Sequence, residues 1–356
     1  MIEVISMIVL FAPLLLVLFL ANWAELERER GNSAGGLTAV TYLILVLLYA
    51  VLIGLGLILQ LVSGLLSGGN LPPELLQAYQ TAGIDLAVIE SVVASLPSIG
   101  LGLWLPSLLG LLLLLPAVRR LLARFIPIDP ANPVHAVALA LSTLVVTNLL
   151  VTLGIGLGNL AEAASTTEQN AGSLLVQLWA QQLLTALLAL VGVGWLLRRN
   201  GRSLWQRLGI TRLNGRQLLI GVGIGLALVP IVIGLETASS AVGWEATDVD
   251  RLTEALLGPL FTSIPGILTL GLSAAIGEET LFRGALQPRF GLPLTALLFA
   301  LLHSTYGLSI ATVVVFILGY ILGWLRNHYS TSTSMVVHAI YNMTLGVISY
   351  LSVGNI

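Results

Sequence analysis

Apolar residues occur in long runs along the whole chain, and short polar segments separate the runs. A helix of about 20 apolar residues crosses the hydrocarbon core of a bilayer. Hydropathy therefore predicts an all-α fold, a polytopic transmembrane helix bundle of about ten spans. The predicted spans lie near 5–24, 37–65, 97–118, 134–158, 173–197, 217–236, 261–286, 292–305, 309–326 and 333–352.

The amino-acid composition supports a membrane protein and restricts the kinds of catalytic site that the chain can form. Hydrophobic residues make up 57% of the 356 residues and charged residues 9%, whereas about a quarter of the residues of a soluble domain are charged. The net charge of −2 and the absence of a basic patch interleaved with aromatic residues argue against nucleic acid as a partner. All 15 basic residues are arginines and there is no cysteine, which excludes a Ser-Lys dyad, disulfides and thiolate chemistry.

The arginines predict the orientation. They follow alternate spans, and only Arg251 falls in a loop assigned to the outside. By the positive-inside rule, both termini then lie outside, in a multi-pass integral membrane protein. The first apolar run lacks the basic flank of a signal peptide, so we expect it to remain as a helix.

The basic segment 198–216 divides the chain. It is either an interfacial stretch on the anionic cytoplasmic leaflet or an ordinary cytoplasmic loop. Residues 1–200 form a transmembrane region of unknown role, while residues 201–356 hold the ionisable clusters. In the segment 67–96 the pattern predicts one or two short amphipathic helices at the outer surface.

Three predicted spans carry polar groups that the hydrocarbon disfavours by about 2.5–3.5 kcal/mol for each strongly charged residue. At about 1.5 Å per residue, all three spans place these groups at a comparable depth from the predicted cytoplasmic side. They would meet in a cavity that faces the cytoplasm. The groups are Glu278, Glu279 and Arg283 in one span, His303 in the next, and His338 with Asn342 in the last.

Spacing within the helices suggests roles. Glu279 and Arg283 are four residues apart and can pair, while Glu278 is turned about 100° away and can face a cavity. There it is suited to take a proton from water. His338 and Asn342 share a helix face, from which an imidazole and an amide could donate to an oxyanion.

In this order, Glu-Glu-x-x-x-Arg, Phe-x-x-x-His and His-x-x-x-Asn resemble the motifs of the CPBP (Abi) family of intramembrane endopeptidases, which includes type II CAAX prenyl endopeptidases. The resemblance covers about 255–350 and implies a peptidase domain within 201–356. It implies that Glu278 activates water that His303 helps to hold, and that His338 and Asn342 stabilise the oxyanion. Glu279 and Arg283 would support the site. Prenylated C-terminal peptides, leader peptides and bacteriocin-like peptides are all compatible substrates.

Several alternatives stay open at this stage. Glu278, His303 and His338 could bind Zn²⁺, since two histidines and a glutamate form known catalytic zinc sites; a metal-free glutamate mechanism is equally compatible, so no cofactor is certain. A scaffold or immunity factor without turnover would keep the same residues. An ion-coupled transporter is disfavoured because the helices beyond His303 look apolar. Asn148 is expected to form a hydrogen bond between helices.

Overall fold

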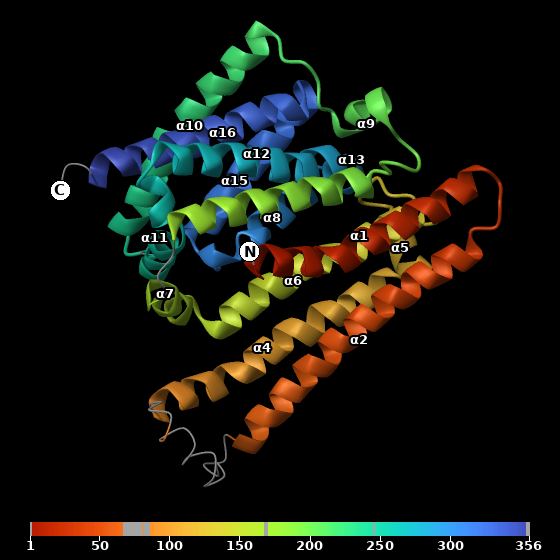
Figure 1. Cartoon of the computed structure of the whole chain (residues 1–356), viewed down its shortest axis with the longest axis horizontal. Helices are drawn as coiled ribbons and strands as arrows, with labels where there is room; N and C mark the ends of the chain where they lie inside the picture. The colour runs from red at the N-terminus through yellow and green to blue at the C-terminus, as the bar shows by residue number, and fades with distance from the viewer. Residues whose placement is uncertain (1, 67–80, 82–85, 167–169, 245, 354–356) are drawn as a thin grey trace.

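The computed structural model describes residues 2–66, 81, 86–166, 170–244 and 246–353. Within those residues helices dominate and there is no β-strand, which confirms the all-α fold. Figure 1 shows α2 and α4 at one edge of the bundle and α10 and α16 at the opposite edge. The eight long helices are α1 (Ile2–Glu29), α2 (Gly35–Leu66), α4 (Leu86–Leu113), α6 (Pro133–Ile155), α8 (Ala171–Gly192), α10 (Gly215–Ala241), α15 (Ile310–His328) and α16 (Thr331–Val353).

Shorter elements connect the long helices and build the centre of the C-terminal half. They are α5 (Pro116–Leu122), α7 (Leu157–Thr166), α9 (Gly201–Leu208), α11 (Thr247–Phe261), α12 (Ile264–Glu279), the π-helix η1 (Thr280–Leu286), α13 (Gln287–Phe290), α14 (Leu292–Leu302) and the 3₁₀ turn η2 (Ser304–Tyr306).

The number of spans is smaller than the predicted ten. In the described residues, eight helices are long and apolar enough to cross a membrane, or nine if a bent pair counts as one span. That pair is α11 with the segment Ile264–Phe290, and it is bent by 114° between its two arms. The predicted span 292–305 is α14, whose 11 residues reach only about 16 Å. The chain is a multi-pass integral membrane protein.

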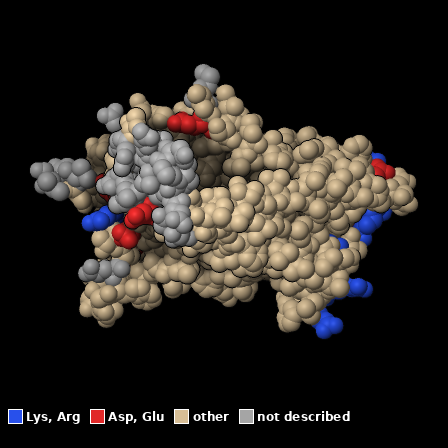
Figure 2. Space-filling model, turned by 90° about the horizontal axis from the view of Figure 1, so that it is seen from below, with Lys and Arg blue, Asp and Glu red and all other residues tan. Residues whose placement is uncertain are grey.

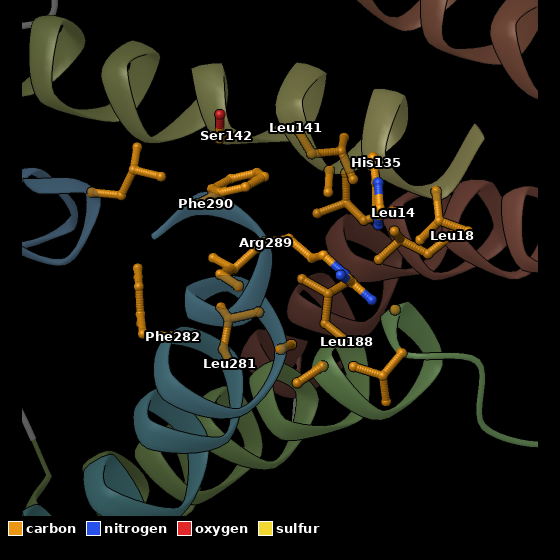
Figure 3. Close-up of a pocket in the computed structure, with 18 of the residues that line it drawn as sticks. Leu14, Leu18, His135, Leu141, Ser142, Leu188, Leu281, Phe282, Arg289 and Phe290 are labelled. Carbon is orange, nitrogen blue, oxygen red and sulfur yellow. The ribbon is translucent and has the colours of Figure 1, made fainter. Parts of the chain in front are cut away.

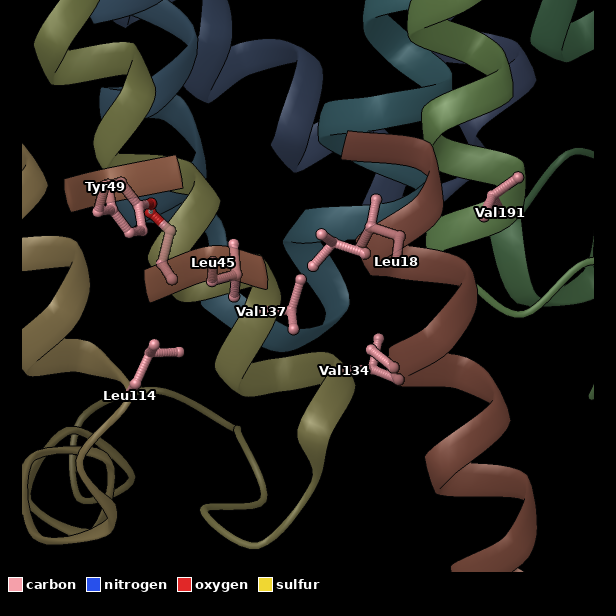
Figure 4. Packing of buried hydrophobic residues seen from close by; sticks show 10 residues of the cluster. Leu18, Leu45, Tyr49, Leu114, Val134, Val137 and Val191 are labelled. Carbon is pink, nitrogen blue, oxygen red and sulfur yellow. Dashed lines mark hydrogen bonds between the residues drawn. The ribbon is translucent and has the colours of Figure 1, made fainter. Parts of the chain in front are cut away.

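The N-terminal helices share one apolar core (Figure 4). Its buried side chains come from α1, α2, α6 and α8 and from the end of α4, and they include Leu18, Leu45, Tyr49, Val137 and Val191. The Tyr49 hydroxyl donates to the Ala140 carbonyl, so the polar atom of this buried ring is satisfied. Helices α6 and α8 also pack against the C-terminal half, α6 on α14 and α8 on α12.

Glycines allow helices α10 and α16 to approach closely. Gly221 and Gly225 of α10 face Val336 and Ile340 of α16, where an added Cβ would come within 2.8 Å of side-chain atoms. Gly223, between them, faces open space. Small residues at such contacts let backbones pack in van der Waals range, and this contact holds α16 in place beside the polar centre.

Charged side chains are scarce on the middle of the surface. On the face drawn in Figure 2, most arginine atoms gather at one end and the belt between the ends is nearly free of charge. Large apolar side chains such as Leu47, Ile58 and Leu61 of α2 are exposed on the helix surfaces. Such a belt matches the hydrocarbon of a bilayer.

Two polar segments can be compared with expectation. The basic segment 198–216 contains α9, which buries Leu204 and Leu208 and exposes Trp205, so it has the amphipathic character of an interfacial helix. Of the segment 67–96, residues 67–80 and 82–85 lie outside the described residues, and residues from 86 onward belong to α4.

Candidate active site

The polar centre lies where α12 passes into the π-helix η1. Glu278 and Glu279 are the last residues of α12, and Arg283 lies inside η1. A π-helical turn widens the helix by one residue per turn and occurs often at functional sites. All three side chains are buried, and Arg283 and Glu279 are 1% and 0% exposed.

Glu279 is the hub of a buried ionic cluster. Its Oε1 lies 3.1 Å from Arg283 Nη1, and the same oxygen lies 2.9 Å from His338 Nδ1 on α16. The Arg283 Nη1 contact has ion-pair distance but not the angle of a hydrogen bond. Arg283 also donates to the Gly319 carbonyl at 3.1 Å and lies over the Phe299 ring, 4.2 Å from its centroid. The cluster therefore ties η1, α14, α15 and α16 together.

Glu278 faces both histidines. Its Oε2 lies 3.9 Å from His303 Nε2 and 4.0 Å from His338 Nε2. His303 is the residue at which α14 ends, and its Nδ1 lies 2.8 Å from the Phe299 carbonyl, while the ring stacks on Tyr306. One water molecule can join Glu278 Oε2 to a histidine Nε2 across this distance, because its oxygen would lie about 2.8 Å from each of the two atoms.

The tautomers follow from the partners. The Phe299 carbonyl can only accept, so Nδ1 of His303 carries the hydrogen. Glu279, paired with Arg283, accepts in the same way from Nδ1 of His338. In the neutral rings both Nε2 atoms are then acceptors. They point toward Glu278 Oε2, which is buried without a hydrogen-bond partner among the described residues, so three acceptors converge where a proton donor fits.

Gln182 of α8 is a site residue that the sequence analysis missed. Its Nε2 donates to Glu278 Oε1 at 2.9 Å, and its own Oε1 is buried and has no hydrogen-bond partner in the described chain. The contact depends on Gly277, since a Cβ there would lie 2.6 Å from the Gln182 carbonyl oxygen. A polar pair, Gln181-Gln182, in the middle of an otherwise apolar span was the available signal.

Two asparagines occupy different places. Asn342 lies one turn after His338 and lines a cavity beside it, and within the described residues its amide has no hydrogen-bond partner. Asn148 of α6 donates to the Ser304 hydroxyl at 2.8 Å, which confirms the predicted hydrogen bond between helices. That bond fixes the turn that follows His303.

Two cavities reach the centre, and Glu278, His303 and Gln182 line both. The larger has a volume of about 1010 Å³ and extends between the N-terminal helices and η1, α13 and α14 (Figure 3). The smaller has a volume of about 620 Å³ and also contains His338 and Asn342. Water therefore has room on both sides of Glu278.

The smaller cavity corrects one expectation. The helices beyond His303 were expected to be apolar, which disfavoured an ion-coupled transporter. Instead the cavity continues past Tyr306 and Tyr341 to Glu236 and Asp250. Sequence reasoning considered only spans seven to ten and missed the polar residues that α10 and α11 contribute. The polar residues around Glu278 are therefore open to cavities on two sides.

The donor set does not have the geometry of a zinc centre. Tetrahedral zinc with bonds of about 2.0–2.1 Å to nitrogen and oxygen holds its donor atoms about 3.4 Å apart. The separations of Glu278 Oε2 from the two Nε2 atoms are 3.9 and 4.0 Å. In the described chain no group of three or more His, Asp or Glu residues could hold a metal ion.

Comparisons with known proteins agree with the motif resemblance. Residues 260–344 match the family described as type II CAAX prenyl endopeptidase Rce1-like. A Bacillus subtilis (strain 168) protein named uncharacterized protein YpbD is 38% identical over 86 residues, which cover 22% of this chain and 45% of that protein. The chain thus spans about half the length of this relative. No solved structure matches this chain. Residues 260–344 of this chain are therefore similar to the Rce1-like type II CAAX prenyl endopeptidases, in agreement with the resemblance to the CPBP (Abi) family.

Proposed function

We propose that the protein is an intramembrane endopeptidase that hydrolyses a peptide bond with water activated by Glu278. One observation carries the proposal: Glu278 Oε2 is buried without a hydrogen-bond partner among the described residues, within 4.0 Å of two histidine Nε2 atoms. A carboxylate in that position is a suitable general base for a water that the histidines hold. The family match supports peptide-bond cleavage as the reaction.

The proposed reaction has two proton transfers. A water between Glu278 and His303 gives one proton to the Glu278 carboxylate while its oxygen attacks the carbonyl carbon of the substrate. The tetrahedral intermediate then collapses, the C–N bond breaks, and the proton passes from Glu278 to the leaving amine. The carboxylate is regenerated, so the cycle consumes one water and releases two peptides.

Asn342 is the better neutral donor for the oxyanion. Its amide N–H groups have no other acceptor in the described chain and lie in the cavity beside Glu278. His338 already donates through Nδ1 to Glu279, so its Nε2 can donate only in the imidazolium form. In that form His338 can assist Asn342 as charge develops on the substrate oxygen.

Glu279 and Arg283 have a supporting role. Their pair is buried and satisfied partly by the Gly319 carbonyl and by the ring of Phe299. It holds the His338 ring in one tautomer. Gln182 is likewise a positioning residue, since its amide binds Glu278 Oε1, the carboxylate oxygen that does not face the histidines.

The substrate we propose is a membrane-associated peptide. The arginine-rich end of the bundle is proposed as the cytoplasmic one because the positive-inside rule applies to those loops. The larger cavity reaches from Glu278 to that end. Cleavage would then take place near the cytoplasmic surface.

The test is cleavage profiling of a library of membrane peptides by the full-length protein and by Glu278→Gln. Glu254→Gln is the matched control, because Glu254 lines the smaller cavity but is exposed and away from the histidines. Loss of a general base lowers turnover by about 10²- to 10⁴-fold. Equal cleavage by wild type and Glu278→Gln refutes the assignment, and a folded wild type with no cleavage supports the scaffold alternative.

A further inference from the structure

The arginine-rich end of the larger cavity has a feature that peptide hydrolysis does not use. Figure 3 shows Arg289 extending from the helix of Phe290 into the cavity, toward His135 and Leu14. Glu278 and His303 line the inner end of the same cavity. The cavity therefore joins a charged mouth to the polar centre.

Positive charge is in excess at this mouth. Besides Glu278, the lining has three carboxylates against five arginines, which leaves two positive charges uncompensated. Two of the arginines are paired: Arg28 with Glu25 and Asp129, and Arg198 with Glu29. The lining residues in question are Arg28, Arg198, Arg199, Arg207, Arg289, Glu25, Glu29 and Asp129.

The other three arginines have no carboxylate partner in the described chain. Arg199 donates to the Val193 carbonyl, and Arg207 donates to the carbonyls of Gly284 and Ala285 at 2.8 and 3.1 Å. These carbonyls accept hydrogen bonds from the guanidinium N–H groups, but they do not neutralise the positive charge of the two arginines. Burial, and then the nearby charges of Arg289 and Arg199, lower the pKa of Arg207 to about 10. The three positively charged groups thus line one cavity mouth with no carboxylate partner in the described chain, and an anion bound there would reduce their mutual repulsion.

The walls below the mouth are apolar. Leu14, Leu18, Leu188, Leu281 and Phe290 line the cavity between the N-terminal helices and η1. A ligand that fits this space has an apolar chain and an anionic end. Three guanidinium groups exceed what one carboxylate can neutralise, whereas a phosphate offers more charge and more acceptor oxygens. Basic pockets between transmembrane helices are known to bind phosphate headgroups of lipids.

We propose that the larger cavity binds a phosphate-headed membrane lipid, with its phosphate on Arg199, Arg207 and Arg289 and its chain between α1, α6, α8 and η1. The charge complementarity at the mouth and the apolar walls carry the assignment. Such a lipid shares the cavity that leads to Glu278, and its binding does not depend on whether the protein is a peptidase.

Binding is tested on the delipidated full chain in neutral detergent, by calorimetric titration with dodecyl phosphate and with dodecanol. Dodecyl phosphate is expected to bind and dodecanol is not. Arg289→Gln should weaken binding by about tenfold or more, because a charge-assisted contact is lost. Arg289 is exposed, so this variant is expected to fold. Arg202→Gln, an exposed arginine of α9 outside the cavity lining, is the matched control.

A second variant tests the chain-binding part. Ser142→Phe fills the apolar cavity and leaves every arginine, so it should abolish binding of dodecyl phosphate while ethyl phosphate, titrated alone, still binds weakly at the mouth. Equal affinity of wild type and Arg289→Gln, or equal losses in Arg289→Gln and Arg202→Gln, overturns the proposal. So does tighter binding of N-acetyl-trileucine, an apolar peptide with a carboxylate, than of dodecyl phosphate.

Native mass spectrometry then distinguishes the lipid sources. Retention of dioleoyl phosphatidylglycerol, with dioleoyl phosphatidylcholine lost, identifies a glycerophospholipid site. Retention of farnesyl phosphate in preference to phosphatidylglycerol identifies a site for polyprenyl phosphates. Either pattern supports a phosphate-headed lipid, and retention of neither overturns it.

Discussion

The hydrogen bond from Gln182 to Glu278 gives the sharpest test of the site, because it joins the family-matched segment to a helix outside it. Gln182→Met keeps the size and flexibility of the side chain and removes the amide. The bond is 2.9 Å long between buried groups, and a hydrogen bond to a charged group contributes about 1.5–3 kcal/mol. If that energy holds Glu278 in its reactive orientation, kcat/KM falls by about 10- to 150-fold.

The assay is hydrolysis of a peptide identified by cleavage profiling, with kcat and KM measured separately and thermal unfolding recorded for each variant. A positioning role lowers kcat, whereas a purely structural role would lower the unfolding temperature and leave the kcat of the folded fraction unchanged. Gln181→Met is the matched control, since Gln181 is the exposed neighbour on the same helix. A kcat of Gln182→Met within threefold of wild type would refute the reasoning.

Three further predictions concern the surroundings of Glu278. Arg283→Met removes the arginine partner of the fully buried Glu279 and should destabilise the protein by about 3–5 kcal/mol, measured as a lower midpoint of denaturation in detergent; an unchanged midpoint would contradict the ion-pair account. Gly277→Ala should separate α8 from α12 and cost about 1–3 kcal/mol together with most activity, whereas Gly223→Ala, which faces open space, should not destabilise. After dialysis against a strong chelator, activity should persist because the donor atoms are too far apart for zinc; loss of activity that added zinc restores would overturn this expectation.

The sequence predicted the fold class because apolar runs in a bilayer admit only helices when no closed barrel is possible. It overcounted spans at 292–305, where hydropathy alone cannot show that a helix ends at His303. The bend between α11 and α12 was also missed, because the charged residues of α11 placed it in a predicted outside loop between two spans.

For the site, helical spacing was informative where both partners lie on one helix. The pairing of Glu279 with Arg283 was predicted from four-residue spacing and is present. Contacts between helices were harder to predict. The sequence indicated only that Glu278, His303 and His338 lie at a similar depth in the membrane, not that their side chains meet. Gln182 was missed because the rotation of α8 relative to α12 is set by packing at Gly277. The catalytic roles and the division at residue 200 stay predictions.

The brevity of α14 has a consequence for biogenesis. With 11 residues it covers about half of the hydrocarbon. His303 bonds the carbonyls of Phe299 and Ala300, but the last carbonyls of the helix would face lipid unpaired if the helix entered the bilayer alone. Unpaired backbone groups are not tolerated there. Helix α14 must therefore be laid against α15 and α6, its packing neighbours, and membrane insertion of the N-terminal half has to precede completion of the histidine-bearing turn.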